Sequence, residues 1–467
     1  MKDFIKFIKS SGIYFFGNIL TKLISFLLLP IYTKFINPTD YGTYDLMIAY
    51  ITFFTSVLFL DIWSGIMRFM FDYDKVEDKY KSIFTGSSIF IISTGLYSIS
   101  IFIFSRFIKV DYIIYIYLYG LLMNLQNLSS FIVRGLGKNI TYVVSGMIST
   151  IVTLTCNIVF LVYLKWDYSS LYISSCLGFF ISSIINLKSV NYFRKDFYKY
   201  FNKDIFLNLL KFSLPLCLNS TAYWFLTSYN KVVITNNLSA YDNGLYTVAA
   251  KFSVAITLLT SCFQMAWQEI SYSKGMDENN KNFYSEAINL YIKFLTLGIL
   301  GLISVVYLIF PFMVDSQYGE AKNIIPLYLL ATLASCLSSF IGNIFGAIKH
   351  TKSIFITMVA SSLANVIIIN LLINKIGINA ASISLFIGFV INVILRIFIL
   401  KKKLMIKIDY KFIIMSCILF IYVYLTYVNG GIALNIVSVI VVLITTLYIF
   451  KDYLLIFYNK ITKNTVK

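Results

Sequence analysis

Charged residues are scarce in this sequence. Asp, Glu, Lys and Arg make up 13% of the 467 residues, whereas 59% are hydrophobic and 18% are aromatic. The mean hydropathy is +0.80, and a soluble domain is typically about one-quarter charged. The apolar runs continue to the C-terminus, so a cleaved signal peptide does not account for them. The composition excludes an ordinary soluble protein and predicts an all-α integral membrane protein.

Histidine, paired cysteines and phosphate-binding loops are also lacking. The one histidine, His350, ends an apolar run, and one imidazole cannot build a His-based metal site or a catalytic dyad. None of the six cysteines stands in a CxxC pair, and all lie in apolar runs, where Cys behaves as a small apolar residue. No GxxxxGK[ST] stretch occurs. The sequence therefore predicts no catalytic residue, no metal site, no cofactor and no ATP hydrolysis.

Acidic residues are fewer than basic ones, 21 against 39, and the formal net charge is +18. In a soluble protein this excess would suggest nucleic acid as a partner. In a membrane protein, Lys and Arg collect in cytoplasmic loops, which accounts for the excess without a nucleic acid.

Long apolar segments are abundant. A helix that crosses a bilayer needs about 20 mostly apolar residues. About fourteen segments qualify: 12–36, 43–67, 82–104, 112–133, 142–164, 168–187, 209–235, 245–270, 288–314, 324–348, 354–373, 379–400, 411–428 and 432–450. If the N-terminus is placed inside, more than two-thirds of the 39 basic residues fall in the cytoplasmic loops and terminal segments. This bias predicts cytoplasmic N- and C-termini.

One loop pattern occurs twice. "FINPTDYGTY" (35–44) and "NNLSAYDNGLY" (236–246) share Asp, one residue, Gly, one residue, Tyr. We interpret both as outer turns that place helices at the mouth of a cavity, and predict gate or turn roles for Pro38, Gly42, Tyr44, Gly244 and Tyr246. Each half holds an even number of spans, so the repeat is parallel.

The repeat also predicts the domains. They are a six-helix lobe at 1–187, a basic cytoplasmic linker at 188–208 and a second six-helix lobe at 209–400. Two additional helices and a cytoplasmic tail occupy 401–467. Internal repeats of this kind are typical of transporters with a site at the repeat interface.

Basic residues inside the spans are the candidate substrate-binding groups, because a charge inside the bilayer is costly and marks function. Lys22 lies near mid-membrane, and with Asn18 and Ser25 it forms a polar stripe on one helix face. Lys251 either lines the cavity or reaches the outer surface. Lys231 and Arg396 lie nearer span ends, where snorkelling to the surface competes with a cavity role.

Asp61 is the deepest acid of the predicted spans. It shares a helix face with Arg68 in "FLDIWSGIMRF". Two interpretations stay open for these residues: a structural pair, and a carboxylate that couples transport to an ion or a proton.

The opening stretch "SSGIYFFGNILTKLISFLLLPIYTKFINPTDYGTYDLMIAY" (10–50) resembles the start of bacterial polysaccharide exporters. These are the lipid-linked O-antigen and capsule repeat-unit flippases of the multidrug/oligosaccharidyl-lipid/polysaccharide exporter superfamily. The positions that carry the resemblance are Gly17, Asn18, Lys22, Pro38, Tyr41, Gly42 and Tyr44. "FSLPLCLNSTAYWFLTSYNKVVI" (212–234) is similar to the seventh span of that family.

The resemblance implies a V of two lobes around a cavity that opens alternately to each side of the bacterial cytoplasmic membrane. The implied cargo is an undecaprenyl-pyrophosphate-linked oligosaccharide, and two extra C-terminal helices accompany a groove for its lipid tail. The implied partners are that cargo, membrane lipids, and the polysaccharide polymerase and chain-length machinery. No enzyme activity is implied.

Two alternatives remain. A drug/cation antiporter of the same superfamily would need buried acid, whereas the predicted spans hold more base than acid. An O-antigen polymerase or ligase would need a sizeable outer loop with catalytic polar residues, whereas all predicted outer loops are short.

Overall fold

The computed structural model describes residues 26–107, 110–194, 197–274, 281–348 and 350–451, and within these ranges every regular element is helical. The first half comprises α2 (Leu29–Phe35), α3 (Pro38–Leu58), α4 (Ile62–Met70), α5 (Val76–Phe107), α6 (Ile113–Gly135), α7 (Asn139–Ile158), η1 (Val159–Tyr163) and α8 (Ser169–Ser189). Two short helices, η2 (Tyr192–Arg194) and α9 (Phe197–Tyr200), lie in the basic linker.

The second half continues the helical pattern. It comprises α10 (Lys203–Thr227), α11 (Tyr229–Asn237), α12 (Ala240–Lys251), α13 (Ser253–Lys274), α14 (Lys281–Met313), η4 (Ser316–Ile324), α15 (Ile325–Ala347), α16 (Thr351–Ile376), α17 (Asn379–Leu404), α18 (Tyr410–Asn429) and α19 (Ile432–Ile449).

The described helices agree with thirteen of the fourteen predicted spans. Eleven are long and apolar enough to cross a membrane, and two bent pairs raise that number to 13 if each pair is one span. The remaining predicted span, 12–36, lies mostly outside the described residues. The all-helical membrane fold is thus confirmed, and the count of fourteen stays a prediction.

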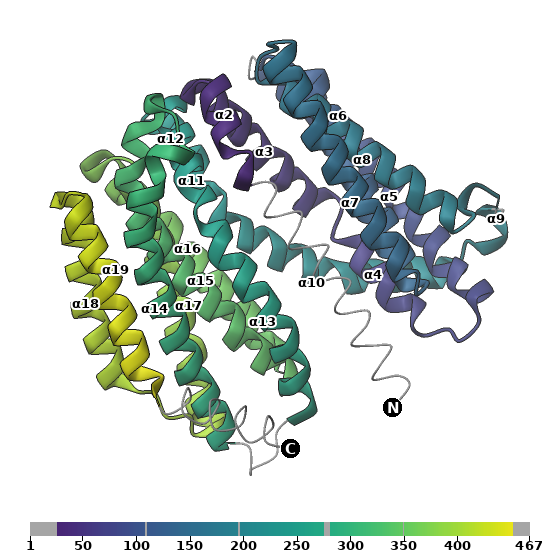
Figure 1. The fold of residues 1–467 in the computed structure, drawn as a ribbon. Coiled ribbons are helices and arrows are strands. Elements are labelled where there is room, and N and C mark those ends of the chain that lie inside the picture. Colours follow the sequence, from purple (N-terminus) through teal and green to yellow (C-terminus); the bar gives the residue numbers. More distant parts are fainter. Residues whose placement is uncertain (1–25, 108–109, 195–196, 275–280, 349, 452–467) are drawn as a thin grey trace, which may run out of the picture.

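The helices form two groups that meet through α3 and α12 (Figure 1). The helices α5 to α8 lie in one group and α13 to α17 in the other, with α18 and α19 at the far edge of the second. These last two helices pack on α14, where the hydroxyls of Ser304 and Ser438 are 2.8 Å apart.

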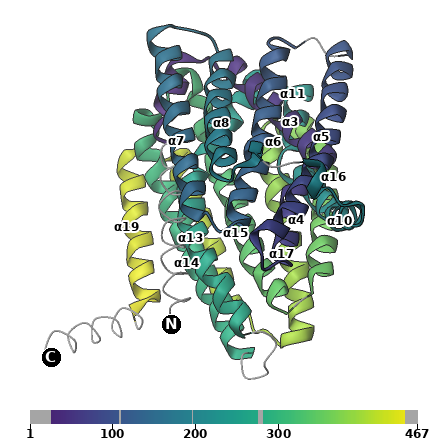
Figure 2. The ribbon, with the colours of Figure 1, turned by 90° about the vertical axis from the view of Figure 1, so that its right-hand side faces the viewer.

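One helix is shared by the two groups. In Figure 1, α10 runs across the long helices, and Figure 2 shows it nearly end-on. It contacts the first half, where Cys217 donates to the carbonyl of Val57. It also contacts α16, where Ser362 donates to the carbonyl of Ala222 over 2.6 Å. The helix therefore joins the halves, while the predicted domain limits stay a prediction.

The two repeated loops are helix starts rather than turns, which corrects the turn interpretation. Asn37 caps α3 by accepting from the backbone of Asp40, and Ser239 caps α12 by accepting from that of Asp242. Pro38 occupies the first turn of α3, where its missing N–H costs nothing. The helices therefore begin about five residues before the predicted spans. The corresponding residues Gly42, Tyr44, Gly244 and Tyr246 lie inside them.

The second and eighth predicted spans are both bent. The bend between α3 and α4 is 47°, and the bend between α12 and α13 is 40°. At the first bend, Leu60 and Asp61 adopt left-handed φ values of 55° and 50°. Non-glycine residues rarely adopt this conformation, so the helix breaks there.

Candidate functional site

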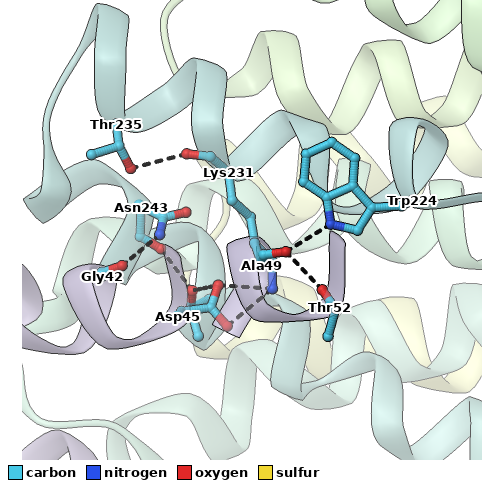
Figure 3. A network of polar contacts seen from close by, with 9 residues as sticks. Gly42, Asp45, Ala49, Thr52, Trp224, Lys231, Thr235 and Asn243 are labelled. Carbon is cyan, nitrogen blue, oxygen red and sulfur yellow. Dashed lines mark hydrogen bonds and ion pairs between the residues drawn. The ribbon is translucent and has the colours of Figure 1, made fainter. Parts of the chain in front are cut away.

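A reciprocal glycine contact brings the two halves close together. A Cβ added to Gly42 would lie 1.8 Å from the carbonyl oxygen of Ala240, and one added to Gly244 would lie 2.0 Å from that of Pro38. Asn243 reinforces the contact by donating to the carbonyl of Gly42 over 2.7 Å (Figure 3). Only glycine permits backbones to approach this closely, so α3 and α12 lie backbone to backbone.

One turn deeper, Asp45 joins three helices. Its carboxylate lies 2.8 Å from the ammonium of Lys231 in α11 and accepts a 2.7 Å hydrogen bond from the hydroxyl of Thr247 in α12. The side chains of Lys231 and Asp45 are 23% and 14% exposed. Figure 3 shows Lys231 reaching down from α11 to Asp45 on α3. Lys231 is thus bound to an acid of the other half instead of reaching a membrane surface.

The next turn of α3 continues this network. The carbonyl of Ala49 accepts hydrogen bonds from the indole of buried Trp224 and from the hydroxyl of Thr52, each over 2.8 Å (Figure 3). One turn further, Thr55 accepts from the fully buried Asn124 over 3.1 Å. The hydrogen bond from Trp224 to Ala49 therefore joins α10 to α3, and the ion pair between Lys231 and Asp45 joins α11 to α3.

Lys251 lies at the end of α12, where the chain bends into α13. It follows Thr247 by one helical turn and therefore lies on the same face of α12. It is half-buried, and it makes no hydrogen bond or ion pair within the part of the chain that the structure describes. Among these three side chains, two lysines and one carboxylate, positive charge exceeds negative by one, whereas the acids Asp40 and Asp242 lie nearer the helix starts.

Arg396 occupies a different place from the one predicted for it. Arg396 is 2% exposed, and its guanidinium lies among α15, α16 and α17. It donates to the carbonyl and hydroxyl of Ser338 and to the hydroxyl of Thr357. These contacts hold three helices of the second half together. Arg396 therefore neither snorkels to a surface nor joins Lys231 and Lys251.

Asp61 and Arg68 do not pair with each other. Arg68 pairs with Asp72 at 2.6 Å on the surface, where both side chains are more than half exposed. Asp61 lies at the bend between α3 and α4 and accepts a 2.9 Å hydrogen bond from Ser64. The predicted pair therefore does not form, and the ion-coupling alternative for Asp61 stays a prediction.

Three predicted site residues, Asn18, Lys22 and Ser25, lie outside the described residues. Three others were missed by the sequence interpretation: Asp45, Thr247 and Trp224. Asp45 lies so near the start of its predicted span that it would count as interfacial. The repeat could have indicated two of these residues. Its offset of 202 residues aligns Asp45 with Thr247, so both copies of this position are polar.

Comparison with known proteins agrees with this architecture. A family model described as "Polysaccharide biosynthesis protein" matches residues 7–267. "Lsg locus putative protein 1" of Haemophilus influenzae is 22% identical over 267 residues, which are 56% of this chain and 65% of that relative. The chain thus spans less than two-thirds of the length of this curated relative.

Solved structures share the fold at low sequence identity. The lipid II flippase MurJ, in an inward closed conformation, superposes with a TM-score of 0.71 at 20% identity, over 96% of this chain and all of that one. An inward-facing MATE-family multidrug transporter of the MOP superfamily gives a TM-score of 0.63 at 15% identity, over 81% of this chain and 92% of that one.

These likenesses show that the chain shares its fold with both solved structures, as the resemblance of residues 10–50 implied. The family model covers more than half of the sequence. The chain therefore belongs to the polysaccharide biosynthesis protein family.

Proposed function

We propose that this protein is a flippase for a lipid-linked oligosaccharide. It moves an undecaprenyl-pyrophosphate-linked repeat unit from the cytoplasmic to the outer leaflet of the bacterial cytoplasmic membrane, by alternating access. The observation that carries the proposal is the excess of positive charge formed by Lys231, Lys251 and Asp45 near the junction of the halves.

The charge of the cargo explains why such an excess is useful. A pyrophosphate is an anion, and hydrocarbon is a costly environment for any charge. Lys231 is already neutralised by Asp45 at 2.8 Å. Lys251 is the cation that this proposal assigns to the pyrophosphate, and Lys22 is its proposed partner. Membership of a polysaccharide biosynthesis family supports a glycan on the other side of the pyrophosphate.

The glycine contact supports alternating access. In this arrangement the first turns of α3 and α12 lie backbone to backbone, and they belong to the face that we propose as extracellular. Export would require the Gly42–Gly244 contact and the Asp45 network to separate, because both join the halves at that face. The glycan would then pass to the polysaccharide polymerase and chain-length machinery.

The rival class is a cation antiporter with the same fold. A cation carrier needs an acid that is free to bind its cargo. Asp45, the acid of the network described above, is held by Lys231 and Thr247. The basic excess therefore favours an anionic cargo over a cationic one.

Replacing Lys251 by alanine tests the proposal directly. We expect export to fall about tenfold or more, because a hydrogen bond to a charged group contributes roughly 1.5–3 kcal/mol. Lys251→Arg should retain most of the export, since it keeps the charge. The measurement is the surface glycan of cells that depend on this protein, normalised to the amount of protein in the membrane. Lys375→Ala, at the last turn of α16, is the control. Equal export by Lys251→Ala and the unmodified protein would refute the anionic site.

The proposed orientation predicts a labelling pattern. In a cysteine-free background, a membrane-impermeant maleimide added to whole cells should label Cys at position 39, an exposed residue in the first turn of α3. It should not label Cys at position 202, which is exposed in the basic linker, until the cells are opened. The reverse pattern would place the termini outside.

A further inference from the structure

A long apolar groove separates α18 from the rest of the second half. It has a volume of about 710 Å³ and is lined by α14, α15, α17 and α18. Ligand pockets commonly measure about 300–1,000 Å³, so the groove can hold a sizeable molecule. It shares no residue with the Asp45 network, and Lys251 does not line it. The groove is therefore distinct from the proposed pyrophosphate site, although it lies beside one of the two C-terminal helices for which the resemblance implied a groove for the cargo's lipid tail.

The groove follows the axis of α17. Phe386, Val390, Ile394 and Phe398 line it at every fourth residue, and Lys401 lines its end. From Phe386 to Lys401 the helix rises by about 22 Å at 1.5 Å per residue. The hydrocarbon core of a bilayer is about 30 Å thick. The groove therefore runs from one end of the span past the middle of the membrane, with the length and direction of a lipid chain.

The groove is open toward the bilayer. Ile394 and Phe398 on one wall are 59% and 56% exposed, and Ile421 on the opposite wall is 56% exposed. An empty apolar cavity does not hold water, and the medium around these side chains is lipid. A hydrocarbon chain is thus the occupant that matches the walls.

The end of the groove at Lys401 is basic. The ammonium of Lys401 lies 2.6 Å from the hydroxyl of Tyr410, and that of Lys402 lies 4.5 Å from the ring centre of Phe398. The acid of this loop, Asp409, is paired with Lys293 at 2.9 Å. The hydrogen bond from Lys293 lowers the pKa of Asp409 from its ordinary value, so this carboxylate stays ionised and neutralised by its partner. Lys401 and Lys402 therefore leave a net positive mouth.

We infer that this groove binds an anionic membrane phospholipid, with an acyl chain along α17 and α18 and the head-group phosphate at Lys401 and Lys402. The predicted topology places this loop at the cytoplasmic leaflet, whose surface is negatively charged. A lipid bound there would fill the space between α18 and the second half. It would act as a resident component, because its head group lies on a different helix from the proposed pyrophosphate site at Lys251.

Lipid binding to the purified full-length protein tests the inference. The probes are phosphatidylglycerol and phosphatidylcholine with identical acyl chains, titrated into delipidated protein and counted by native mass spectrometry. We expect the unmodified protein to retain phosphatidylglycerol more tightly. The double variant Lys401→Ala with Lys402→Ala should weaken the binding of phosphatidylglycerol about 25-fold, because each lysine near a charged head group contributes roughly fivefold. The binding of phosphatidylcholine should change little.

A second variant tests the apolar part. Cys417 lines the groove and is exposed, so Cys417→Trp should fill the groove without disturbing the core. Cys417→Trp should weaken the binding of both phospholipids. The control Ile440→Trp, on the exposed face of α19, should weaken the binding of neither. Thermal unfolding in detergent verifies that each variant is folded.

Two results would overturn the inference. Unchanged phosphatidylglycerol binding in both folded variants would remove the site. Tighter binding of undecaprenyl phosphate than of phosphatidylglycerol, lost in the same variants, would assign the groove to the tail of the transported lipid instead. Neither result bears on Lys251, so the proposed function is tested independently.

Discussion

Replacing Gly42 or Gly244 with valine should nearly abolish export while the protein remains folded in the membrane. The new Cβ would lie 1.8–2.0 Å from a backbone carbonyl oxygen of the other half, and a backbone atom cannot rotate away as a side chain can. Overpacking of this kind costs about 1–3 kcal/mol. That cost disfavours the closed contact by roughly 5- to 150-fold, so the carrier would spend too little time in this arrangement to complete its cycle.

Two measurements distinguish this effect from general damage. The first is cross-linking between Cys at position 39 and Cys at position 241, which should decrease in the Gly42→Val background. The second is export by Gly298→Val, because the space around Gly298 is empty within 4 Å, and this control should export normally. If Gly42→Val cross-links and exports like the parent protein, the glycine contact has no role in the cycle.

Asp45→Ala should be the most destabilising change of a charged residue in the described network. This change leaves Lys231 without its carboxylate partner, although only 23% of the Lys231 side chain is exposed. Removing one member of a buried pair costs about 3–5 kcal/mol, and we expect about 3 kcal/mol here because both side chains keep some exposure. The unfolding temperature of the purified protein should fall, and export should fall with it.

The double variant Asp45→Ala with Lys231→Ala identifies the cause. It should be more stable than Asp45→Ala alone, because it removes the unpaired charge as well as the pair. The matched control is Asp72→Ala, which breaks the exposed pair with Arg68 and should cost no more than about 1 kcal/mol. A double variant that is no more stable than Asp45→Ala would show that the ion pair is not what Asp45 provides.

The membrane spans were predictable because they depend on composition over a long window. Each span from residue 43 onward corresponds to a helix or a bent helix pair, since any run of about 20 apolar residues satisfies its backbone only as a helix in lipid. The starts of α3 and α12 were misread for a local reason. Asn-Pro and Ser followed by Asp three residues later are helix caps as well as turn signals.

The partners of the charged residues were not predictable in the same way. Lys231 and Arg396 both lie near the ends of their predicted spans. Lys231 nevertheless contacts an acid 186 residues away, whereas Arg396 contacts Ser338 and Thr357. Such contacts depend on which helix faces are brought together, and hydropathy carries no information about that. Only the 202-residue repeat linked distant positions, and it did so for Gly42 and Gly244 as well as for Asp45 and Thr247.

The contact between Asp45 and Thr247 bears on the origin of the fold. The predicted repeat makes Asp45 and Thr247 copies of one ancestral position, and the hydroxyl of Thr247 donates to the carboxylate of Asp45 over 2.7 Å. In a symmetric dimer of identical halves, each residue at such a position meets its own copy. Two aspartates there would repel each other, and two threonines would leave Lys231 without an acid. The contact therefore requires two unequal copies, which a single fused chain can hold and a homodimer cannot.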